Sequence, residues 1–170
     1  LQSALRSHYA LPAGDLAARV RALNRLLYEL TEPEHYATLF LGEYDDASGQ
    51  LRYANCGHPT PLIVRRDGTV LRLDSTGVPL GLFPSWRGDT DATRLEPGDA
   101  LLLVTDGISE RADATGAFVS ESRLIEVFHA GRARAIDLLV RELVDGMPGA
   151  GGAFPCDDAT VVVARRRAAQ

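Results

Sequence analysis

The first clear pattern along the chain is an apolar stripe over residues 15–30. Aliphatic side chains recur there at steps of three and four residues, at Leu16, Val20, Leu23, Leu27 and Leu30, which places them on one face of a helix. Asp15 precedes the stripe, where a carboxylate can cap the first amides. The spacing predicts an amphipathic helix over residues 15–30. Residues 1–9 also have helical composition but no capping residue, so we expect the chain to start within a helix.

From residue 37 the apolar period changes to that of strands. Segments 38–41 and 51–54 flank a turn-forming run of Asp, Ser and Gly, which is typical of a β-hairpin. Segments 61–64 and 70–73 form a second pair, joined through Asp67-Gly68, and an Asp-Gly pair tolerates the positive φ of a tight turn. The pattern therefore predicts a mostly antiparallel sheet.

The second half combines an apolar strand, two helices and a final strand. Residues 100–105 are almost wholly apolar, helical stretches follow at 121–130 and 133–144, and a last buried strand is expected over 159–164. Hairpins with helices grouped around them are typical of the α+β class. With 170 residues and 45% hydrophobic content, the chain is expected to form one domain over residues 1–170.

Composition narrows the classes of function. The net charge is −5 and the single basic block is the tail at 165–167, so no surface for nucleic acid or an anionic membrane is expected. The longest apolar run, residues 100–104, is far too short to cross a membrane. Cys56 and Cys156 are far apart in the sequence, which fits neither a disulfide framework nor a zinc site and indicates a reducing cytoplasm.

Carboxylates adjoin the two most apolar strands. The strand at 100–105 leads into Asp106-Gly107, and Asp157 and Asp158 precede the last strand. If these strands are antiparallel neighbours, the carboxylates meet at one end of a sheet and repel one another unless a cation neutralises them. Hard oxygen ligands favour Mg²⁺ or Mn²⁺. Two such ions activate water for attack on a phosphoryl group, so that no side-chain nucleophile is needed.

Each of these motifs also has a purely structural interpretation. An Asp-Gly pair is usually a turn, and two aspartates before a strand are usually solvated. Cys56 and His58 are near neighbours without a distant partner, which makes a poor metal site. His58 is therefore either a turn residue with satisfied hydrogen bonds or a residue with a role in catalysis.

Six segments follow one another in a recognisable order. They read Tyr-Ala-Thr-Leu-Phe at 36–40, Tyr-Ala-Asn-Cys-Gly-His-Pro-Thr-Pro at 53–61, Gly-Val-Pro-Leu-Gly at 77–81, Leu-Glu-Pro-Gly-Asp at 95–99, Leu-Val-Thr-Asp-Gly-Ile-Ser-Glu at 103–110 and Asp-Asp-Ala-Thr-Val-Val at 157–162. Together they resemble the stage II sporulation protein E-like branch of the 2C-type, or PPM, metal-dependent protein phosphatases. The resemblance implies an αββα sandwich of mostly antiparallel sheets flanked by helices. It also implies a binuclear Mn²⁺ or Mg²⁺ site and hydrolysis of phosphoserine or phosphothreonine on a protein.

The resemblance assigns site residues by position. The metal ligands of the family fall on Asp106 and Asp157, while Asp158 stands where many relatives have asparagine. Gly107, Asp158 and His58 are thus further candidates for contact with metal or substrate. The family carries an earlier Gly-Asp-Val-Ser-Gly-x-Gly-like segment, whose aspartate bridges the two metals, and these 170 residues do not contain it. We therefore expect an N-terminally truncated domain that by itself binds metal weakly and has little or no activity.

Three functional hypotheses remain open. The leading one is a protein serine/threonine phosphatase that follows a sensor domain in the full chain and acts on a phosphorylated anti-sigma-factor antagonist in a partner-switching pathway. Its substrate and sensor come from the resemblance alone. The second is a catalytically inactive phosphatase-like module that binds a protein partner, because the bridging carboxylate is missing. The third is a metal-dependent phosphoesterase for small molecules.

Overall fold

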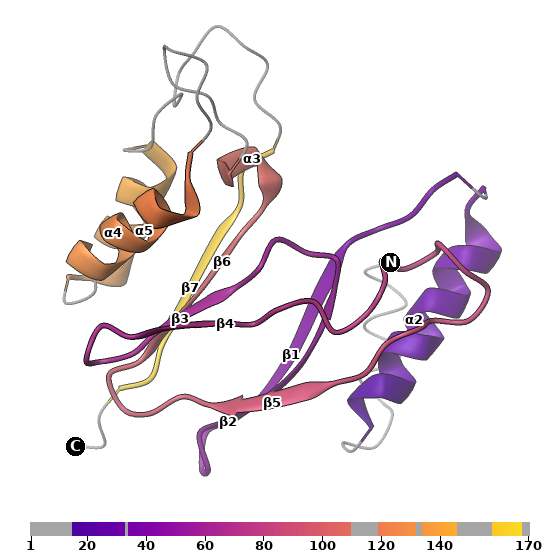
Figure 1. The fold of residues 1–170 in the computed structure, drawn as a ribbon, viewed down its shortest axis with the longest axis horizontal. Coiled ribbons are helices and arrows are strands. Elements are labelled where there is room, and N and C mark those ends of the chain that lie inside the picture. Colours follow the sequence, from indigo (N-terminus) through magenta and orange to yellow (C-terminus); the bar gives the residue numbers. More distant parts are fainter. Residues whose placement is uncertain (1–14, 33, 110–118, 132–133, 146–157, 168–170) are drawn as a thin grey trace, which may run out of the picture. The chain divides into compact units, whose positions relative to one another are not determined.

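The computed structural model describes residues 15–32, 34–109, 119–131, 134–145 and 158–167. The chain divides into two compact units, one within residues 1–58 and 74–94 and the other within residues 59–73 and 95–170. Each unit contains its own antiparallel sheet (Figure 1). The expectation of one domain over residues 1–170 stays a prediction. The helix expected over residues 1–9 lies outside the described residues.

The first unit combines one helix with a three-stranded sheet. Helix α2 (Leu16–Leu30) starts after Asp15, whose carboxylate accepts a hydrogen bond from the Ala18 N–H at 2.9 Å. The predicted helix and its cap are thus confirmed. Strands β1 (Leu39–Asp45), β2 (Gln50–Cys56) and β5 (Asp91–Arg94) follow the order β1-β2-β5, and the first predicted hairpin is β1–β2. The core of the unit buries Val20, Leu23, Ala54, Cys56, Leu80 and Trp86.

Strand β5 is an element that the sequence pattern did not indicate. It reads Asp-Ala-Thr-Arg and has no apolar alternation, yet it pairs antiparallel with β2, with Asp91 opposite Tyr53. The Tyr53 hydroxyl donates a hydrogen bond to the Asp91 carboxylate at 3.2 Å. Main-chain pairing with a neighbour, rather than burial of its own side chains, therefore makes this segment a strand.

The second unit contains a four-stranded sheet with the order β4-β3-β6-β7. Strands β3 (Leu62–Val64) and β4 (Val70–Arg72) form the second predicted hairpin, and β6 (Ala100–Val104) lies between β3 and β7 (Val161–Arg165). The central position of β6 agrees with its unbroken apolar sequence, because a strand paired on both sides within a core is buried on both faces. All of these pairings are antiparallel.

The last strand departs from the prediction of a buried strand. Within the described part of the sheet, β7 pairs on one side only, with β6. Val161 and Val163 pack against the core, while Val162 is 48% exposed. The expectation of a buried last strand is therefore wrong for the face that carries Val162, because apolar composition alone does not distinguish a central strand from one at an edge.

Helices α3 (Asp106–Ser109), α4 (Glu121–Gly131) and α5 (Ile136–Asp145) complete the second unit. Figure 1 shows α4 and α5 beside one another, and they contact β3 and β7 respectively. Buried side chains from strands and helices meet in one cluster, which includes Leu102, Ile108, Phe128, Leu139 and Leu143. In the ranges that the structure describes, no helix is both long and apolar enough to cross a membrane.

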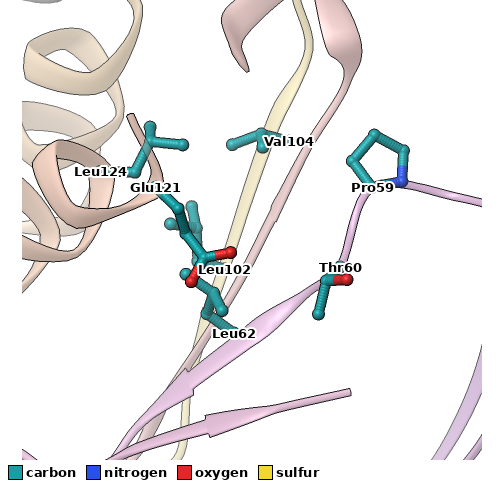
Figure 2. Close-up of a pocket in the computed structure, with 7 residues that line it drawn as sticks. All are labelled: Pro59, Thr60, Leu62, Leu102, Val104, Glu121 and Leu124. Atoms are coloured by element: carbon teal, nitrogen blue, oxygen red, sulfur yellow. The ribbon is translucent and has the colours of Figure 1, made fainter. Parts of the chain in front are cut away.

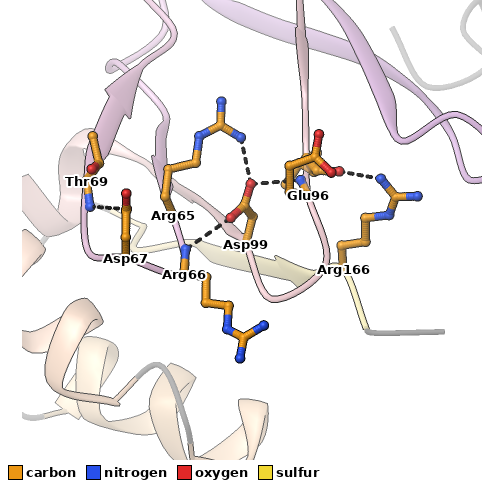
Figure 3. A network of polar contacts seen from close by, with 8 residues as sticks. Arg65, Arg66, Asp67, Thr69, Glu96, Asp99 and Arg166 are labelled. Atoms are coloured by element: carbon orange, nitrogen blue, oxygen red, sulfur yellow. Dashed lines mark hydrogen bonds and ion pairs between the residues drawn. The ribbon is translucent and has the colours of Figure 1, made fainter. Parts of the chain in front are cut away.

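A buried carboxylate ties the turn before β6 to its neighbours (Figure 3). The side chain of Asp99 accepts hydrogen bonds from Arg65 Nη1 at 2.6 Å, from the Arg66 N–H at 3.1 Å and from the Glu96 N–H at 2.8 Å. The Asp99 carbonyl accepts a further bond from the N–H of Arg166, just beyond β7, at 3.0 Å. The turn at residues 96–99 thus links the ends of β3 and β7 to the start of β6.

Candidate functional site

The pairing of β6 with β7 brings two predicted site residues to one end of the second sheet. Val104, the last residue of β6, lies opposite Val161, the first residue of β7. Asp106 follows β6 and Asp158 precedes β7, so both stand beyond the same end of the ladder. The strands are antiparallel neighbours, which is the condition under which the carboxylates were expected to converge. Asp157 lies outside the described residues.

Main-chain and side-chain hydrogen bonds extend this pairing beyond the strands. The Thr105 N–H donates to the Thr160 carbonyl at 3.1 Å, and the Thr160 N–H donates to Thr105 Oγ1 at 2.8 Å. The Thr105 hydroxyl donates in turn to the Asp158 carbonyl at 3.1 Å. The backbone of Asp158 is thereby tied to the residue that precedes Asp106.

Asp106 opens helix α3 rather than a simple turn. Its Oδ1 accepts a hydrogen bond from the Gly107 N–H at 2.9 Å, and the Ile108 N–H donates to the Thr105 carbonyl at 3.0 Å. Gly107 is buried, and Ile108 is fully buried in the core of the unit. The structural interpretation of Asp-Gly as a turn therefore did not anticipate this short helix. The apolar Ile108, whose burial draws the chain back onto the sheet, was the signal that could have indicated it.

The two described carboxylates supply part of a hard-metal donor set. Asp106 and Asp158 are both exposed, so their oxygens can reach a hydrated ion without burial of either charge. Carboxylate oxygens are the ligands that Mg²⁺ and Mn²⁺ take in proteins. Among the residues with described positions, no group of three or more His, Cys, Asp or Glu side chains is arranged to hold a metal. The donor chemistry of these two carboxylates therefore fits such an ion.

His58 belongs to the first unit, whereas Asp106 belongs to the second. It follows β2, and its N–H donates to Asn55 Oδ1 at 2.9 Å in a turn where Gly57 has a φ of 75°. This bond fits the interpretation of His58 as a turn residue, and a role for its imidazole stays a prediction. The neighbouring Cys56 is fully buried, and burial raises the pKa of its thiol to about 11, which agrees with the rejection of a Cys-His metal pair.

An apolar pocket lies on the α4 side of the second sheet (Figure 2). It has an empty volume of about 420 Å³, part of it open solvent, and its lining comprises Pro59, Thr60, Leu62, Leu102, Val104, Glu121 and Leu124. Glu121 projects from α4 toward the strands and forms an ion pair with Arg72. A single carboxylate that already has a cationic partner does not make this pocket a second metal site.

Comparison with known proteins places the chain among relatives that are longer than it. The family model described as stage II sporulation protein E (SpoIIE) matches residues 1–167. The chain is 31% identical over 150 residues to Protein IcfG of Synechocystis sp., which covers 84% of this chain and 23% of that protein. It is 25% identical over 149 residues to the phosphoserine phosphatase RsbU of Bacillus subtilis, and this match covers 87% of this chain and 44% of RsbU. The chain thus spans less than half the length of either relative.

Solved structures show the same fold. The RsbU and RsbW domains of Rv1364c from Mycobacterium tuberculosis match with a TM-score of 0.76 and 27% identity, over 99% of this chain and 46% of that one. The SiaA-PP2C domain of Pseudomonas aeruginosa matches with a TM-score of 0.80 and 18% identity, over 96% of this chain and 66% of that one. The α+β prediction with antiparallel sheets is therefore confirmed. The chain has the fold of PP2C phosphatase domains and belongs to the stage II sporulation protein E family.

Proposed function

We propose that this domain is a metal-dependent protein serine/threonine phosphatase. The observation that carries the proposal is the β6–β7 pairing, with Asp106 and Asp158 beyond one end of the second sheet. A second line of support is that the relatives of this chain include two proteins of Bacillus subtilis named as phosphoserine phosphatases. Oxygen ligands at the end of a rigid strand suit metal-assisted hydrolysis of a phosphate ester.

The proposed cofactor is Mn²⁺ or Mg²⁺, with two ions in the complete domain. Asp106 and Asp157 are the proposed ligands, and Gly107, Asp158 and His58 are candidates for further contacts with metal or substrate. When bound, such ions lower the pKa of a coordinated water and supply hydroxide near neutral pH. No nucleophilic serine or cysteine is then required.

The chain's own residues contribute a fixed end of the sheet and a local negative charge. Because β6 is paired on both sides, the backbone that leads into Asp106 cannot move far, which limits reorganisation of its carboxylate during the reaction. Two neighbouring aspartates repel a phosphate dianion, so this end of the sheet disfavours binding of the substrate until cations neutralise the carboxylates. This repulsion makes hydrolysis dependent on the metal.

The proposed substrate is phosphoserine or phosphothreonine on a protein, of the anti-sigma-factor antagonist type that acts in partner switching. Support comes from the names RsbU and RsbP among the relatives, and from a solved relative that contains both an RsbU and an RsbW domain. A sensor domain upstream and a cytoplasmic location are parts of the same proposal. The widely separated cysteines fit the cytoplasmic location, and the greater length of the relatives fits the sensor domain.

The test measures phosphate release by the full protein that contains this chain, with a phosphoserine peptide and titrated Mn²⁺. We expect hydrolysis that depends on Mn²⁺. In Asp106→Asn the activity should fall about a hundredfold or more, because loss of a metal ligand weakens metal binding at least as much as loss of a group that hydrogen-bonds to a ligand. The matched control is Asp67→Asn, which changes an exposed carboxylate of the same unit in the β3–β4 turn and should leave activity unchanged.

Each other outcome has a defined meaning. Full activity in Asp106→Asn would refute the metal-ligand assignment. Mn²⁺ binding without hydrolysis of any phosphopeptide would favour the inactive binding module. Faster hydrolysis of nucleotides than of phosphopeptides would favour a small-molecule phosphoesterase.

A further inference from the structure

The ladder between β6 and β7 ends on an unusual exchange of partners at Thr105. In an antiparallel pair, two opposite residues that are hydrogen-bonded exchange two N–H to carbonyl bonds. Val104 lies opposite Val161, so Thr105 lies opposite Thr160. One bond of the expected pair is present, from the Thr105 N–H to the Thr160 carbonyl at 3.1 Å. The other is replaced.

The hydroxyl of Thr105 takes the place of its own carbonyl in this ladder. The Thr160 N–H donates to Thr105 Oγ1 at 2.8 Å, while the Thr105 carbonyl accepts from the Ile108 N–H at 3.0 Å in the first turn of α3. The chain can therefore leave the sheet directly after Thr105 and begin a helix at Asp106, while the Thr160 N–H, just before β7, keeps an acceptor. The same hydroxyl then donates to the Asp158 carbonyl at 3.1 Å.

We propose that Thr105 is a positioning residue of the metal site, whose hydroxyl holds the Asp158 backbone at the start of β7 beside Asp106. The inference rests on the proposed phosphatase function, because only that function requires the two carboxylates to meet. Thr105 itself is not a ligand in this proposal. It acts through the two segments that carry Asp106 and Asp158, as hydrogen-bonding groups around metal sites commonly do.

The chemistry of the side chain allows a matched pair of variants. Thr105→Val keeps the branched shape but removes both the donor and the acceptor, so the Thr160 N–H and the Asp158 carbonyl lose this partner. Thr105→Ser keeps the hydroxyl and removes only a methyl group. A positioning role therefore predicts a defect in the valine variant and rescue in the serine variant. Since Thr105 is only half-buried, both variants should fold.

The experiment uses the full protein and measures Mn²⁺ affinity from the electron paramagnetic resonance signal of the unbound ion, which does not depend on activity. For Thr105→Val we expect affinity to fall about tenfold, the lower end of what the loss of a ligand-orienting group costs. At saturating Mn²⁺, kcat and the KM for the phosphopeptide should change little, because the ligands themselves are intact. Thr105→Ser should bind Mn²⁺ like the wild type.

The remaining outcomes separate this inference from the proposed function. Unchanged Mn²⁺ affinity in Thr105→Val, or equal loss in the valine and serine variants, overturns the positioning role even if the protein is an active phosphatase. Unchanged Mn²⁺ affinity in Asp106→Asn overturns the metal site and this inference with it. If Thr105→Val lowers the melting temperature and nothing else, the hydroxyl has a structural role only, and the inference is wrong. If the valine variant does not fold, the Mn²⁺ affinity of Thr105→Ala, which also lacks the hydroxyl, decides between the same outcomes.

Discussion

Replacement of Asp99 tests whether the turn before β6 organises the second unit. The Asp99 side chain is 2% exposed and accepts hydrogen bonds from the Arg65 guanidinium and from two main-chain amides. Asp99→Ala removes both carboxylate oxygens and with them all three hydrogen bonds. Asp99→Asn keeps the shape and one carbonyl oxygen but removes the charge, and the two variants therefore separate the loss of hydrogen bonds from the loss of charge.

The expected magnitude follows from what each donor loses. Removal of one partner from a buried ion pair costs about 3–5 kcal/mol, and a buried amide without an acceptor costs about 1–3 kcal/mol. The Arg65 side chain is 26% exposed, so water compensates part of its loss. We therefore expect Asp99→Ala to lower the free energy of unfolding by about 3 kcal/mol, near the low end of the range for a broken pair. Asp99→Asn should cost about half as much.

The assay is urea unfolding followed by far-ultraviolet circular dichroism. The matched control is Asp67→Ala in the neighbouring turn (Figure 3), where an exposed carboxylate accepts a bond from the Thr69 N–H at 2.9 Å. That bond lowers the pKa of Asp67, but solvent replaces it, so the control should change stability very little. If Asp99→Ala costs no more than Asp67→Ala, the network does not stabilise the unit and the reasoning fails.

Three further predictions concern the first unit. Gly77→Ala would bring a Cβ to 2.6 Å from Trp86 Cζ2, so we expect a loss of about 1–3 kcal/mol in the same urea assay, and a smaller loss would show that the indole can shift. Burial raises the pKa of Cys56 to about 11, so in a Cys156→Ser background the remaining thiol should react with Ellman's reagent only after unfolding, and reaction in the folded protein would contradict its burial. Burial, followed by the charge of Asp91, raises the pKa of Tyr53 from 10.0 to about 12. The neutral phenol thus stabilises the fold fully below pH 10.0, and this contribution disappears as the pH rises toward about 12. Tyr53→Phe should therefore flatten the decline in the free energy of unfolding over that pH range. If the decline is unchanged in this variant, a group other than Tyr53 causes it.

Local sequence was sufficient for helix α2, for strand β6 and for the first carboxylate of the candidate site. The three- and four-residue spacing from Leu16 to Leu30 can bury one face only as a helix, and Asp15 has the side chain that caps it. An unbroken apolar run made β6 central, because both of its faces must be covered. Asp106 stood out because it follows that strand directly.

Other features depend on partners that lie far away in the sequence. Strand β5 forms because its main chain pairs with that of β2. Helix α3 forms because the buried Ile108 returns the chain to the core. The apolar sequence of β7 could not reveal that only one of its faces is covered within the described sheet.

By itself, then, the sequence determined most of the helices and strands and the residue types that can bind a hard metal, since both properties depend on near neighbours and on side-chain chemistry. Only the tertiary structure decided that β6 and β7 are antiparallel neighbours and that the Thr105 hydroxyl, rather than its carbonyl, closes their ladder. The physical reason is that strand partners and register are selected by burial and hydrogen bonding across the whole unit. No local stretch of the chain contains that information.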